Sequence, residues 1–273
     1  MPSERRPSAL TNPRSDRVRA VAALGRRSMR SATGRILIEG PQGVRELIRY
    51  AAPTVVDVYV TAAAADRYAD VVGDALSAGC YVHEATEPVL AAMADAQAPQ
   101  GMLAVAQWAP PTLESVLAAG PRLLVLMTQV RDPGNAGTVI RGADAAGADA
   151  VLVTDNSVDI TSPKVVRSTA GSLFHLPVVT GLDTSATLAA LSAHGIRTLA
   201  TEGGAARTLH DVDLTKPHAW VMGNEAWGLP PELAAACDAR VAIPIYGRAE
   251  SLNLAMAATI CLYTSATAQR AGG

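Results

Sequence analysis

The chain has 273 residues, of which 49% are hydrophobic and 18% are charged, and it holds no apolar run near the roughly 18 residues that a membrane span needs. This composition excludes a membrane-spanning protein and a largely disordered one, and the length suits one large or two small domains. The formal net charge of −2 conceals a segregation: residues 1–50 carry +7, with arginine as their only basic residue type, and the remainder carries −9. A basic N-terminal segment followed by an acidic remainder indicates a polyanionic partner such as nucleic acid, with a presequence or a solvated tail as the alternative.

The three cysteines, Cys80, Cys237 and Cys261, are widely separated and form no C-x-x-C pair. This spacing argues against a disulfide framework and against a thiolate zinc site. No apolar segment typical of a secretion signal follows the charged start. We therefore expect a cytoplasmic protein without a bound metal.

The first part of the chain predicts a small α/β domain over residues 16–110. Residues 1–15 are rich in Pro, Ser and Arg and predict a flexible basic arm, and a basic helix is expected from Asp16 to Arg30. Short strands then alternate with helices. The strands are expected at residues 35–39, 55–61, 80–83 and 103–107, and the helices at 42–50, 63–77 and 88–95.

Pro110 and Pro111 predict a linker, and a second α/β series over residues 111–273 follows it. Its strands are nearly continuous apolar runs, which is typical of a parallel sheet covered by helices on both faces. In such a sheet, ligands bind at the carboxyl ends of the strands. The strands are expected at residues 123–127, 150–154, 176–179, 198–201, 220–223 and 241–244, and the helices at 136–146, 163–172, 187–194, 231–237 and 252–268.

Common nucleotide and hydrolase motifs do not occur in the chain. There is no G-x-x-x-x-G-K-[ST] loop, and Gly134, Gly137 and Gly142 have the wrong spacing for a dinucleotide fingerprint. There is also no H-E-x-x-H or G-x-S-x-G sequence. A P-loop NTPase, a dinucleotide enzyme, a zinc protease and a serine hydrolase are therefore disfavoured.

Polar residues instead follow three of the predicted strands. The first loop leads into Arg141, with Asn135 as the expected helix N-cap. The second holds Glu225 between two glycines. The third leads into the last helix, which Ser251 or Glu250 is expected to cap, with Asn253 in its first turn. Taken singly, each loop also fits an ordinary capped helix or a strand-to-helix turn.

Together, the three loops resemble the motifs of the SpoU/TrmH family, which comprises S-adenosylmethionine-dependent RNA ribose 2'-O-methyltransferases of the SPOUT superfamily. The matching stretches are residues 135–141 (Asn-Ala-Gly-Thr-Val-Ile-Arg), 223–228 (Gly-Asn-Glu-Ala-Trp-Gly), and 243–245 (Ile-Pro-Ile) through 250–253 (Glu-Ser-Leu-Asn). Three further stretches also match: residues 36–40 (Ile-Leu-Ile-Glu-Gly), 99–101 (Pro-Gln-Gly) and 167–171 (Arg-Ser-Thr-Ala-Gly). The resemblance covers residues 16–269.

This resemblance implies an N-terminal L30e-like domain that binds the RNA substrate and a C-terminal methyltransferase domain with a deep trefoil knot. It also implies a homodimer, with S-adenosylmethionine as cofactor. The implied catalytic residues are Arg141, Asn135, Glu225, Ser251 and Asn253. The implied cofactor-binding residues are Leu199, Thr201, Gly223, Ile243 and Leu252.

Arg141 has the central role in the resemblance, sometimes as general base. A guanidinium rarely gives up its proton, so we expect Arg141 chiefly to clamp a phosphate and to stabilise negative charge on the attacking oxygen, with a base role left open. Further arginines are expected to contact RNA phosphates, and the alternative for each is a solvated side chain. These are Arg17, Arg19, Arg26, Arg27, Arg30, Arg35 and Arg167.

The resemblance implies large-subunit (23S) rRNA as the substrate, with either a housekeeping role or a link to antibiotic resistance. Two alternatives stay open. One is a tRNA ribose 2'-O-methyltransferase, and the other is a non-catalytic RNA-binding factor in ribosome assembly.

Overall fold

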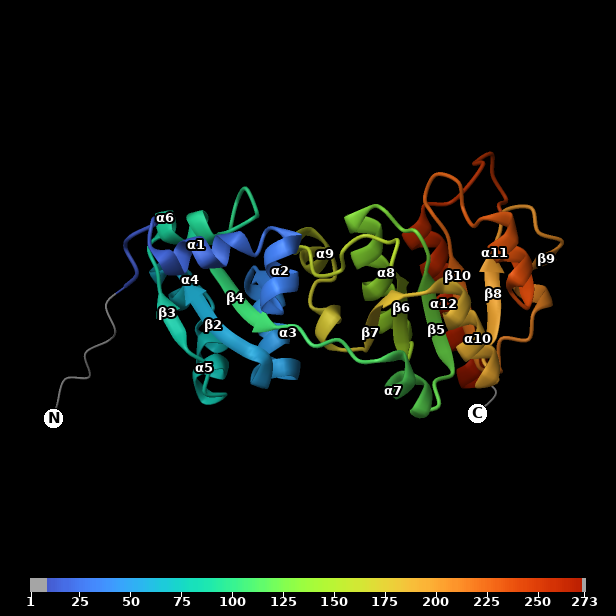
Figure 1. Ribbon diagram of the computed structural model, residues 1–273, viewed down its shortest axis with the longest axis horizontal. Helices are drawn as coiled ribbons and strands as arrows, with labels where there is room; N and C mark the ends of the chain where they lie inside the picture. The colour runs from blue at the N-terminus through green and yellow to red at the C-terminus, as the bar shows by residue number, and fades with distance from the viewer. Residues whose placement is uncertain (1–8, 272–273) are drawn as a thin grey trace. The chain divides into compact units, whose positions relative to one another are not determined.

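The computed structural model describes residues 9–271 and divides into two compact units (Figure 1). The first unit combines the chain up to Ala109 with Thr161–His175, and the second combines Pro110–Ile160 with the chain from Leu176 onward. The predicted boundary at residues 110–111 places Thr161–His175 in the second domain, and this part of the prediction is wrong. In the structure, this segment leaves the second unit and packs within the first.

Residues 1–8, which make up half of the predicted flexible arm, lie outside the described residues. The rest of that arm is held in place. The N–H of Leu10 donates to the carbonyl of Glu84 at 2.8 Å, and the Leu10 carbonyl accepts from the N–H of Thr86 at 3.0 Å. The Leu10 side chain also packs on the core of the first unit, so burial of an apolar residue fixes this stretch.

The first unit is built on a four-stranded sheet in the order β1-β4-β2-β3. Strand β4 is antiparallel to β1 and β2, and β3 is parallel to β2. The strands are β1 (Arg35–Glu39), β2 (Val55–Val60), β3 (Val82–Glu84) and β4 (Met102–Gln107). The helices are α1 (Asp16–Ala23), α2 (Arg27–Thr33), α3 (Pro41–Ala51), α4 (Ala62–Arg67), α5 (Ala69–Ser77), α6 (Glu87–Met93) and α9 (Pro163–Ser168), with one-turn 3-10 helices at Ala52–Thr54 and Ser172–Phe174.

Two helices predicted as continuous are interrupted in the structure. The basic helix from Asp16 to Arg30 is split into α1 and α2 around Gly25, a poor helix former. The helix predicted over residues 63–77 breaks at Tyr68, whose backbone (φ −119°, ψ 42°) leaves the helical region.

Thr161–His175 is attached to the first unit at three places. The guanidinium of Arg30 donates to the Thr161 hydroxyl at 3.0 Å, Arg167 pairs with Glu39, and His175 contacts Glu46 at 3.1 Å. Gly171 passes so close to Glu46 that a Cβ there would lie 2.4 Å from its Cγ, and its φ of 102° suits glycine. Polar contacts and a close backbone approach, which helix periodicity does not reveal, therefore place this segment.

The second unit contains a seven-stranded sheet in the order β7-β6-β5-β10-β8-β11-β9, and every neighbouring pair is parallel, which confirms the prediction of a parallel sheet. The strands are β5 (Leu123–Met127), β6 (Ala150–Thr154), β7 (Val178–Leu182), β8 (Arg197–Thr201), β9 (Arg207–Thr208), β10 (His218–Met222) and β11 (Ala239–Ala242). The helices are α7 (Leu113–Ala118), α8 (Pro133–Ala146), α10 (Thr184–Ala193), α11 (Pro231–Ala236) and α12 (Leu254–Ala271), with a 3-10 turn at Leu209–Asp211.

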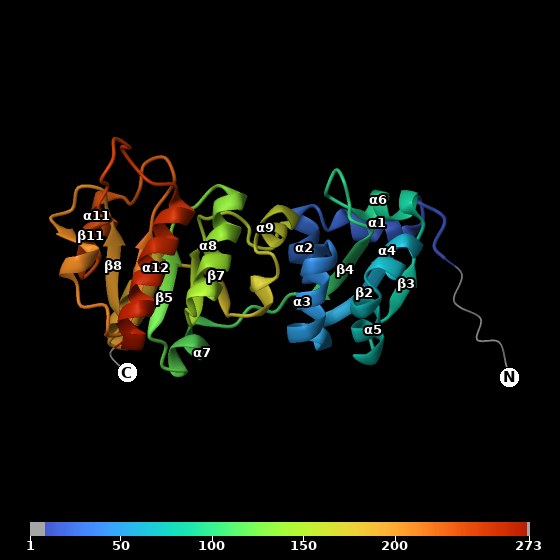
Figure 2. The ribbon, with the colours of Figure 1, turned by 180° about the vertical axis from the view of Figure 1, so that it is seen from behind.

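Helices cover both faces of this sheet. On one face, α7 and α10 pack on alternate side chains of β5, β6 and β10. On the other face, α12 packs on β5 and β10 and runs beside α8, as seen from behind in Figure 2. Leu124 and Leu126 point to the first face, and Trp220 points to α12. The carboxyl ends of the central strands meet at one edge, where the three predicted loops begin.

Candidate active site

The first loop leaves β5 through Gln129, which has a φ of 54°, and enters α8. Asp132 is the N-cap of α8, because its carboxylate accepts a hydrogen bond from the backbone N–H of Asn135 at 2.7 Å. The expectation that Asn135 caps this helix is wrong. Asn135 lies one turn inside, and its side-chain amide is available to bond to other loops.

Glu225, in the second loop, draws the first loop towards β10. Its carboxylate accepts hydrogen bonds from the backbone N–H groups of Arg131 at 3.1 Å and Asp132 at 3.0 Å, and from the Asn135 amide at 3.3 Å. Burial alone raises the pKa of Glu225, but bonds from its own N–H and from these three groups outweigh burial and lower it. Glu225 is therefore an ionised anchor at neutral pH.

Asn253, in the third loop, is bound to the first loop as well. Its amide donates to Oδ1 of Asn135 at 2.9 Å, and its own Oδ1 accepts from the N–H groups of Ala255 at 2.9 Å and Met256 at 3.3 Å. Asn253 thus caps α12, and the expectation that Ser251 or Glu250 caps it is wrong. One chain of hydrogen bonds runs from Glu225 through Asn135 to Asn253 and joins all three loops.

A pocket of about 240 Å³ lies between the second and third loops and the end of β8. Four of the five expected cofactor-binding residues line it: Thr201, Gly223, Ile243 and Leu252. Leu199 does not, because it is fully buried within β8. Ser251 and Glu225 also line the pocket.

The charged side chains that line this pocket are all carboxylates, those of Glu202, Glu225 and Glu250. The remaining wall is formed by apolar side chains, by the uncharged polar residues Thr201, Asn224 and Ser251, and by backbone. Such a lining attracts a cationic ligand with an apolar body, and it opposes binding of a free phosphate.

The second loop is tightly folded at its base. A Cβ at Gly223 would lie 2.3 Å from the carbonyl carbon of Gly228, so only glycine fits there. Asn224, which the sequence reasoning did not select, is buried, and its amide donates to the carbonyl of Gln129 at 2.8 Å. The sequence signal that could have selected Asn224 is its position between Gly223 and Glu225.

Arg141 lies on α8, is exposed, and is not among the residues that line the pocket. Within the described part of the chain its guanidinium makes no hydrogen bond or ion pair. The structure therefore brings together Asn135, Glu225 and Asn253 with Ser251 nearby, and leaves Arg141 pointing to solvent.

The arginines expected at the RNA fall into two groups. Arg17, Arg19, Arg26, Arg27 and Arg35 are exposed. Arg30 is 5% exposed and donates to the carbonyls of Leu24 at 2.7 Å and Gly25 at 2.8 Å, so its assignment to phosphate contact is corrected to a structural one. Arg167 is engaged by the carboxylates of Glu39 and Asp95 and is likewise withdrawn from the phosphate-binding set.

Two further findings concern the described residues as a whole. None of the helices between residues 9 and 271 combines the length and hydropathy that crossing a membrane requires. Over the same residues, no three His, Cys, Asp or Glu side chains are placed to share a metal ion.

Known proteins resemble this chain in both parts. Residues 122–263 match the SpoU rRNA Methylase family, and residues 15–104 match the MRM3-like substrate binding domain. The 23S rRNA (guanosine(2553)-2'-O)-methyltransferase RlmP of Bacillus subtilis is 33% identical over 86% of this chain and 89% of its own length. The 23S rRNA (guanosine-2'-O-)-methyltransferase RlmB of Bordetella pertussis is 32% identical over 84% and 96%.

A solved structure extends the likeness to the fold. The SpoU methyltransferase AviRb from Streptomyces viridochromogenes, in complex with the cofactor AdoMet, superposes with a TM-score of 0.83 at 28% identity. The match covers 95% of this chain and 100% of that one. The likeness therefore spans both units.

Proposed function

The chain belongs to the SpoU rRNA Methylase family, and we propose that it transfers a methyl group from S-adenosylmethionine to a ribose 2'-hydroxyl of 23S rRNA. The observation that carries the proposal is the acidic, backbone-rich pocket beside the hydrogen-bonded loops of Asn135, Glu225 and Asn253. The names of the relatives support the choice of 23S rRNA over tRNA.

The residues present fit the cofactor. Gly223 leaves room for close backbone approach, Ile243 and Leu252 supply apolar wall, and the carboxylates of Glu202 and Glu250 do not repel a positively charged ligand. When bound, S-adenosylmethionine supplies an electrophilic methyl group on a positively charged sulfur. The chain's part is to hold that group in line with the ribose 2'-oxygen and to assist loss of the hydroxyl proton.

The hydrogen-bonded loops do the positioning. Glu225 fixes the start of α8, and Asn135 ties that start to Asn253 at the head of α12. Loss of either bond loosens a pocket wall. Arg141 is available to bind a phosphate next to the target ribose and to stabilise developing charge on the attacking oxygen.

A homodimer is part of the proposal, supported by an apolar stripe on α12. Met256, Ile260 and Tyr263 occupy positions i, i+4 and i+7, and are 58%, 37% and 47% exposed. Arg141 lies on the neighbouring helix α8 and outside the pocket of its own chain. Pairing of two copies through this stripe offers Arg141 of each copy to the pocket of the other.

The dimer proposal has its own test. Ile260→Asp should convert the protein to a monomer in size-exclusion chromatography with light scattering, and should abolish methyl transfer. Mixing Arg141→Ala with a Gly223→Ala variant should restore activity in mixed dimers. If the mixture stays inactive while both variants dimerise, each chain uses its own arginine.

Three finer assignments are also proposals. A deep trefoil knot in the second unit and an L30e-like fold in the first rest on the family resemblance, and a cytoplasmic location rests on the three widely separated cysteines. The domain limits at residues 16–110 and 111–273 are proposed with the exception of Thr161–His175. The link to antibiotic resistance stays a prediction, checked by antibiotic susceptibility of cells with and without the gene.

The decisive experiment measures transfer of tritium from labelled S-adenosylmethionine to purified RNA. Label should enter 23S rRNA and survive as a 2'-O-methylated nucleotide on digestion. Label in tRNA alone would favour the tRNA alternative, and label in neither would favour a non-catalytic assembly factor.

A further inference from the structure

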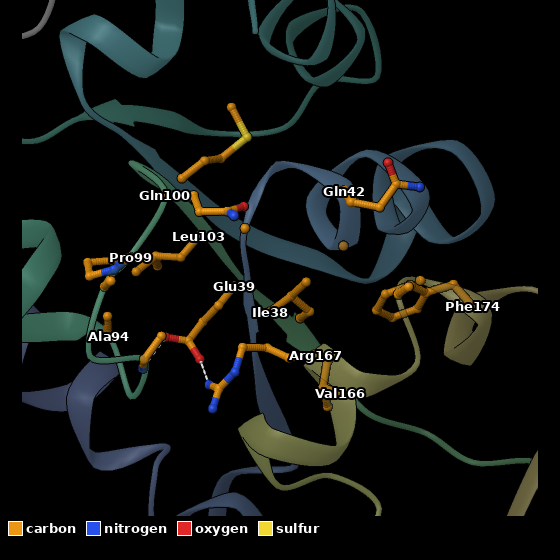
Figure 3. Close-up of a pocket in the computed structure, with 17 residues that line it drawn as sticks. Ile38, Glu39, Gln42, Ala94, Pro99, Gln100, Leu103, Val166, Arg167 and Phe174 are labelled. Carbon is orange, nitrogen blue, oxygen red and sulfur yellow. Dashed lines mark hydrogen bonds and ion pairs between the residues drawn. The ribbon is translucent and has the colours of Figure 1, made fainter. Parts of the chain in front are cut away.

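Three sequence stretches that the proposed active site does not use meet around a second pocket, in the first unit. Residues 36–40, 99–101 and 167–171 all contribute to a cavity of about 280 Å³ (Figure 3). Its residues come from β1, from the loop before β4, and from the end of α9. A function for this pocket accounts for all three stretches.

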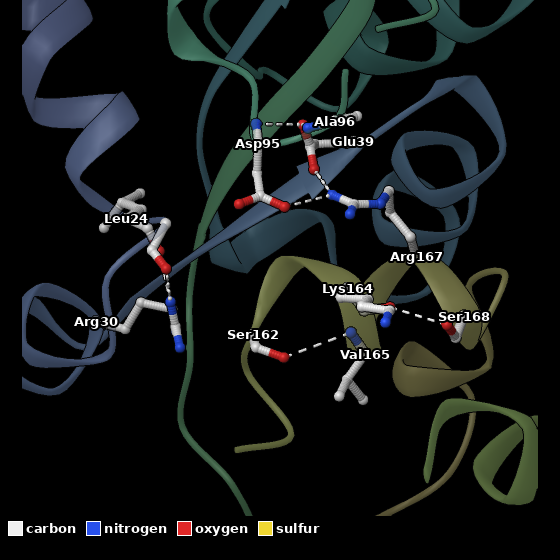
Figure 4. A network of polar contacts seen from close by, with 11 residues as sticks. Leu24, Arg30, Glu39, Asp95, Ala96, Ser162, Lys164, Val165, Arg167 and Ser168 are labelled. Carbon is white, nitrogen blue, oxygen red and sulfur yellow. Dashed lines mark hydrogen bonds and ion pairs between the residues drawn. The ribbon is translucent and has the colours of Figure 1, made fainter. Parts of the chain in front are cut away.

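A rigid polar network forms one side of this pocket (Figure 4). The Glu39 carboxylate is buried and accepts hydrogen bonds from the N–H groups of Asp95 at 2.8 Å and Ala96 at 3.0 Å. It also pairs with the guanidinium of Arg167, which contacts the Asp95 carboxylate at 3.1 Å. Two carboxylates thus hold Arg167 in one orientation, so the wall is formed before any ligand arrives.

The other walls are largely apolar. Ile38, Leu103 and Val166 contribute aliphatic surface, and Phe174, the single phenylalanine of the chain, contributes an aromatic ring (Figure 3). Gln100 lies at the exposed rim, and within residues 9–271 its side-chain amide has no hydrogen-bond partner. The pocket therefore offers flat apolar surface together with the available donor and acceptor groups of the Gln100 amide.

The local charge decides which part of a nucleotide fits. Glu39 and Asp95 carry two negative charges against one positive charge on Arg167. This imbalance repels phosphate, whereas an uncharged, planar, partly apolar group meets no such penalty. Single-stranded RNA is commonly read by stacking of splayed-out bases and by hydrogen bonds to their edges.

We propose that this pocket receives one unstacked base of the substrate RNA, with Gln100 reading its edge. The proposal rests on the proposed function in taking RNA as the substrate. The exposed arginines of the first unit bind phosphates without regard to sequence, and the pocket adds recognition of a single unpaired nucleotide.

The test fills the pocket without disturbing the core. Ala98 is exposed and lines the pocket, so Ala98→Trp plugs it, whereas Ala91→Trp, exposed on α6 and outside the pocket, is the matched control. We expect Ala98→Trp to weaken binding of transcribed 23S rRNA roughly tenfold, the size of one lost stacking contact. The slope of log K against log salt should not change, because no phosphate contact is lost.

A second pair of variants tests the edge contact. Gln100→Ala should weaken binding several-fold, and Gln97→Ala, an exposed glutamine of the same loop outside the pocket, should not. Dimethyl sulfate footprinting of the 23S rRNA should show one unpaired base that the wild type protects and Ala98→Trp exposes.

The outcomes separate this proposal from the proposed function. If the wild type methylates 23S rRNA and Ala98→Trp binds it with unchanged affinity and footprint, the base pocket is refuted and the activity stands. If the wild type methylates no RNA yet Ala98→Trp weakens RNA binding tenfold, the pocket stands and the activity falls. A reduced salt slope for Ala98→Trp would also overturn the pocket, by indicating a phosphate site.

Discussion

The two units hold distant parts of the chain together by different chemistry. In the first unit, buried carboxylates attach Thr161–His175, through the ion pair of Glu39 with Arg167 and the hydrogen bond of Glu46 with His175. In the second unit, amides and hydroxyls predominate, and Glu225 is surrounded by neutral donors. Both Glu39 and Glu225 gather two successive backbone N–H groups. The two glutamates differ in their third partner, which is the charged guanidinium of Arg167 for Glu39 and the neutral amide of Asn135 for Glu225.

That difference predicts where each carboxylate matters. Glu39 is buried and pairs with the Arg167 guanidinium, so its loss removes the buried partner of Arg167 together with the acceptor of two backbone N–H groups, and we expect it to lower stability. Glu225 is exposed and faces dipoles, so its loss moves loops and is felt as reduced catalysis. Four measurements test this contrast, from the largest expected effect to the smallest.

Glu39→Ala should lower the free energy of unfolding of the first unit by about 3–5 kcal/mol, the usual cost of breaking a buried ion pair. Hydrogen exchange of peptides from β1 and α9 should accelerate, while peptides from β5 and β10 stay protected. Asp95→Ala is the control. Because the Asp95 carboxylate is partly exposed, its substitution should lower the free energy of unfolding by less than about 1 kcal/mol. Equal acceleration in both units would contradict the contrast.

Glu225→Ala should lower kcat/KM for methyl transfer by about 10²-fold, as expected when catalytic groups shift by about an ångström. Thermal stability should change little. Glu232→Ala, an exposed glutamate on α11, is the matched control and should be neutral. Full activity of Glu225→Ala would remove the hydrogen-bonded loops from the mechanism.

A buried neutral network in the second unit provides the third measurement. Trp220 donates to the Ser265 hydroxyl at 2.9 Å, Ser265 donates to Nε2 of His218 at 2.7 Å, and Nδ1–H of His218 donates to the carbonyl of Lys216 at 2.7 Å. Ser265→Ala leaves two buried groups without partners and should cost about 1–3 kcal/mol in urea unfolding. Thr267→Ala, an exposed position on α12, should cost little.

Acid should weaken the second unit through His218. Burial is the main reason that its pKa falls below 6.5, with Arg197 adding to the effect and Lys216 and Asp213 opposing it. As the pH falls, His218 therefore binds a proton at a higher pH in the unfolded chain than in the folded one. This contribution to stability is complete above about pH 6.5 and is lost as the pH falls below it. The unfolding free energy of His218→Gln should be flatter between pH 7 and 5.5, and an unchanged slope would exclude His218 as the source.

The sequence predicted best those features that depend on local pattern. Continuous apolar runs located β5 and β6 with their observed ends, and the strand ends located the three loops. The N-caps were predicted wrongly because Asp132 and Asn135 both suit the position. Glu225, which is distant in sequence, draws in the N–H groups of Arg131 and Asp132, and with them the start of α8.

Long-range placement was beyond the reach of sequence pattern. A short helix such as α9 fits either sheet, and contacts with residues distant in sequence, such as the pairing of Arg167 with Glu39, place it in the first unit. Arg30 looks like its exposed neighbours in sequence, yet the turn at Gly25 offers it two carbonyls. Leu199 lies two residues before Thr201 and on the same face of β8, but inside the strand rather than at its carboxyl end, so the sheet buries it and only Thr201 reaches the pocket.

Thr161–His175 belongs to the first unit although the chain on both sides of it belongs to the second, and this has a consequence for biosynthesis. Everything else in the first unit has been translated by Ala109, but its last segment emerges only after β5, α8 and β6. At roughly 5–20 residues per second, a nascent first unit therefore waits several seconds on the ribosome for the partners of Glu39 and Glu46. Its completion is tied to synthesis of the unit that carries the catalytic loops, so a chain released early lacks a finished first unit as well as the active site.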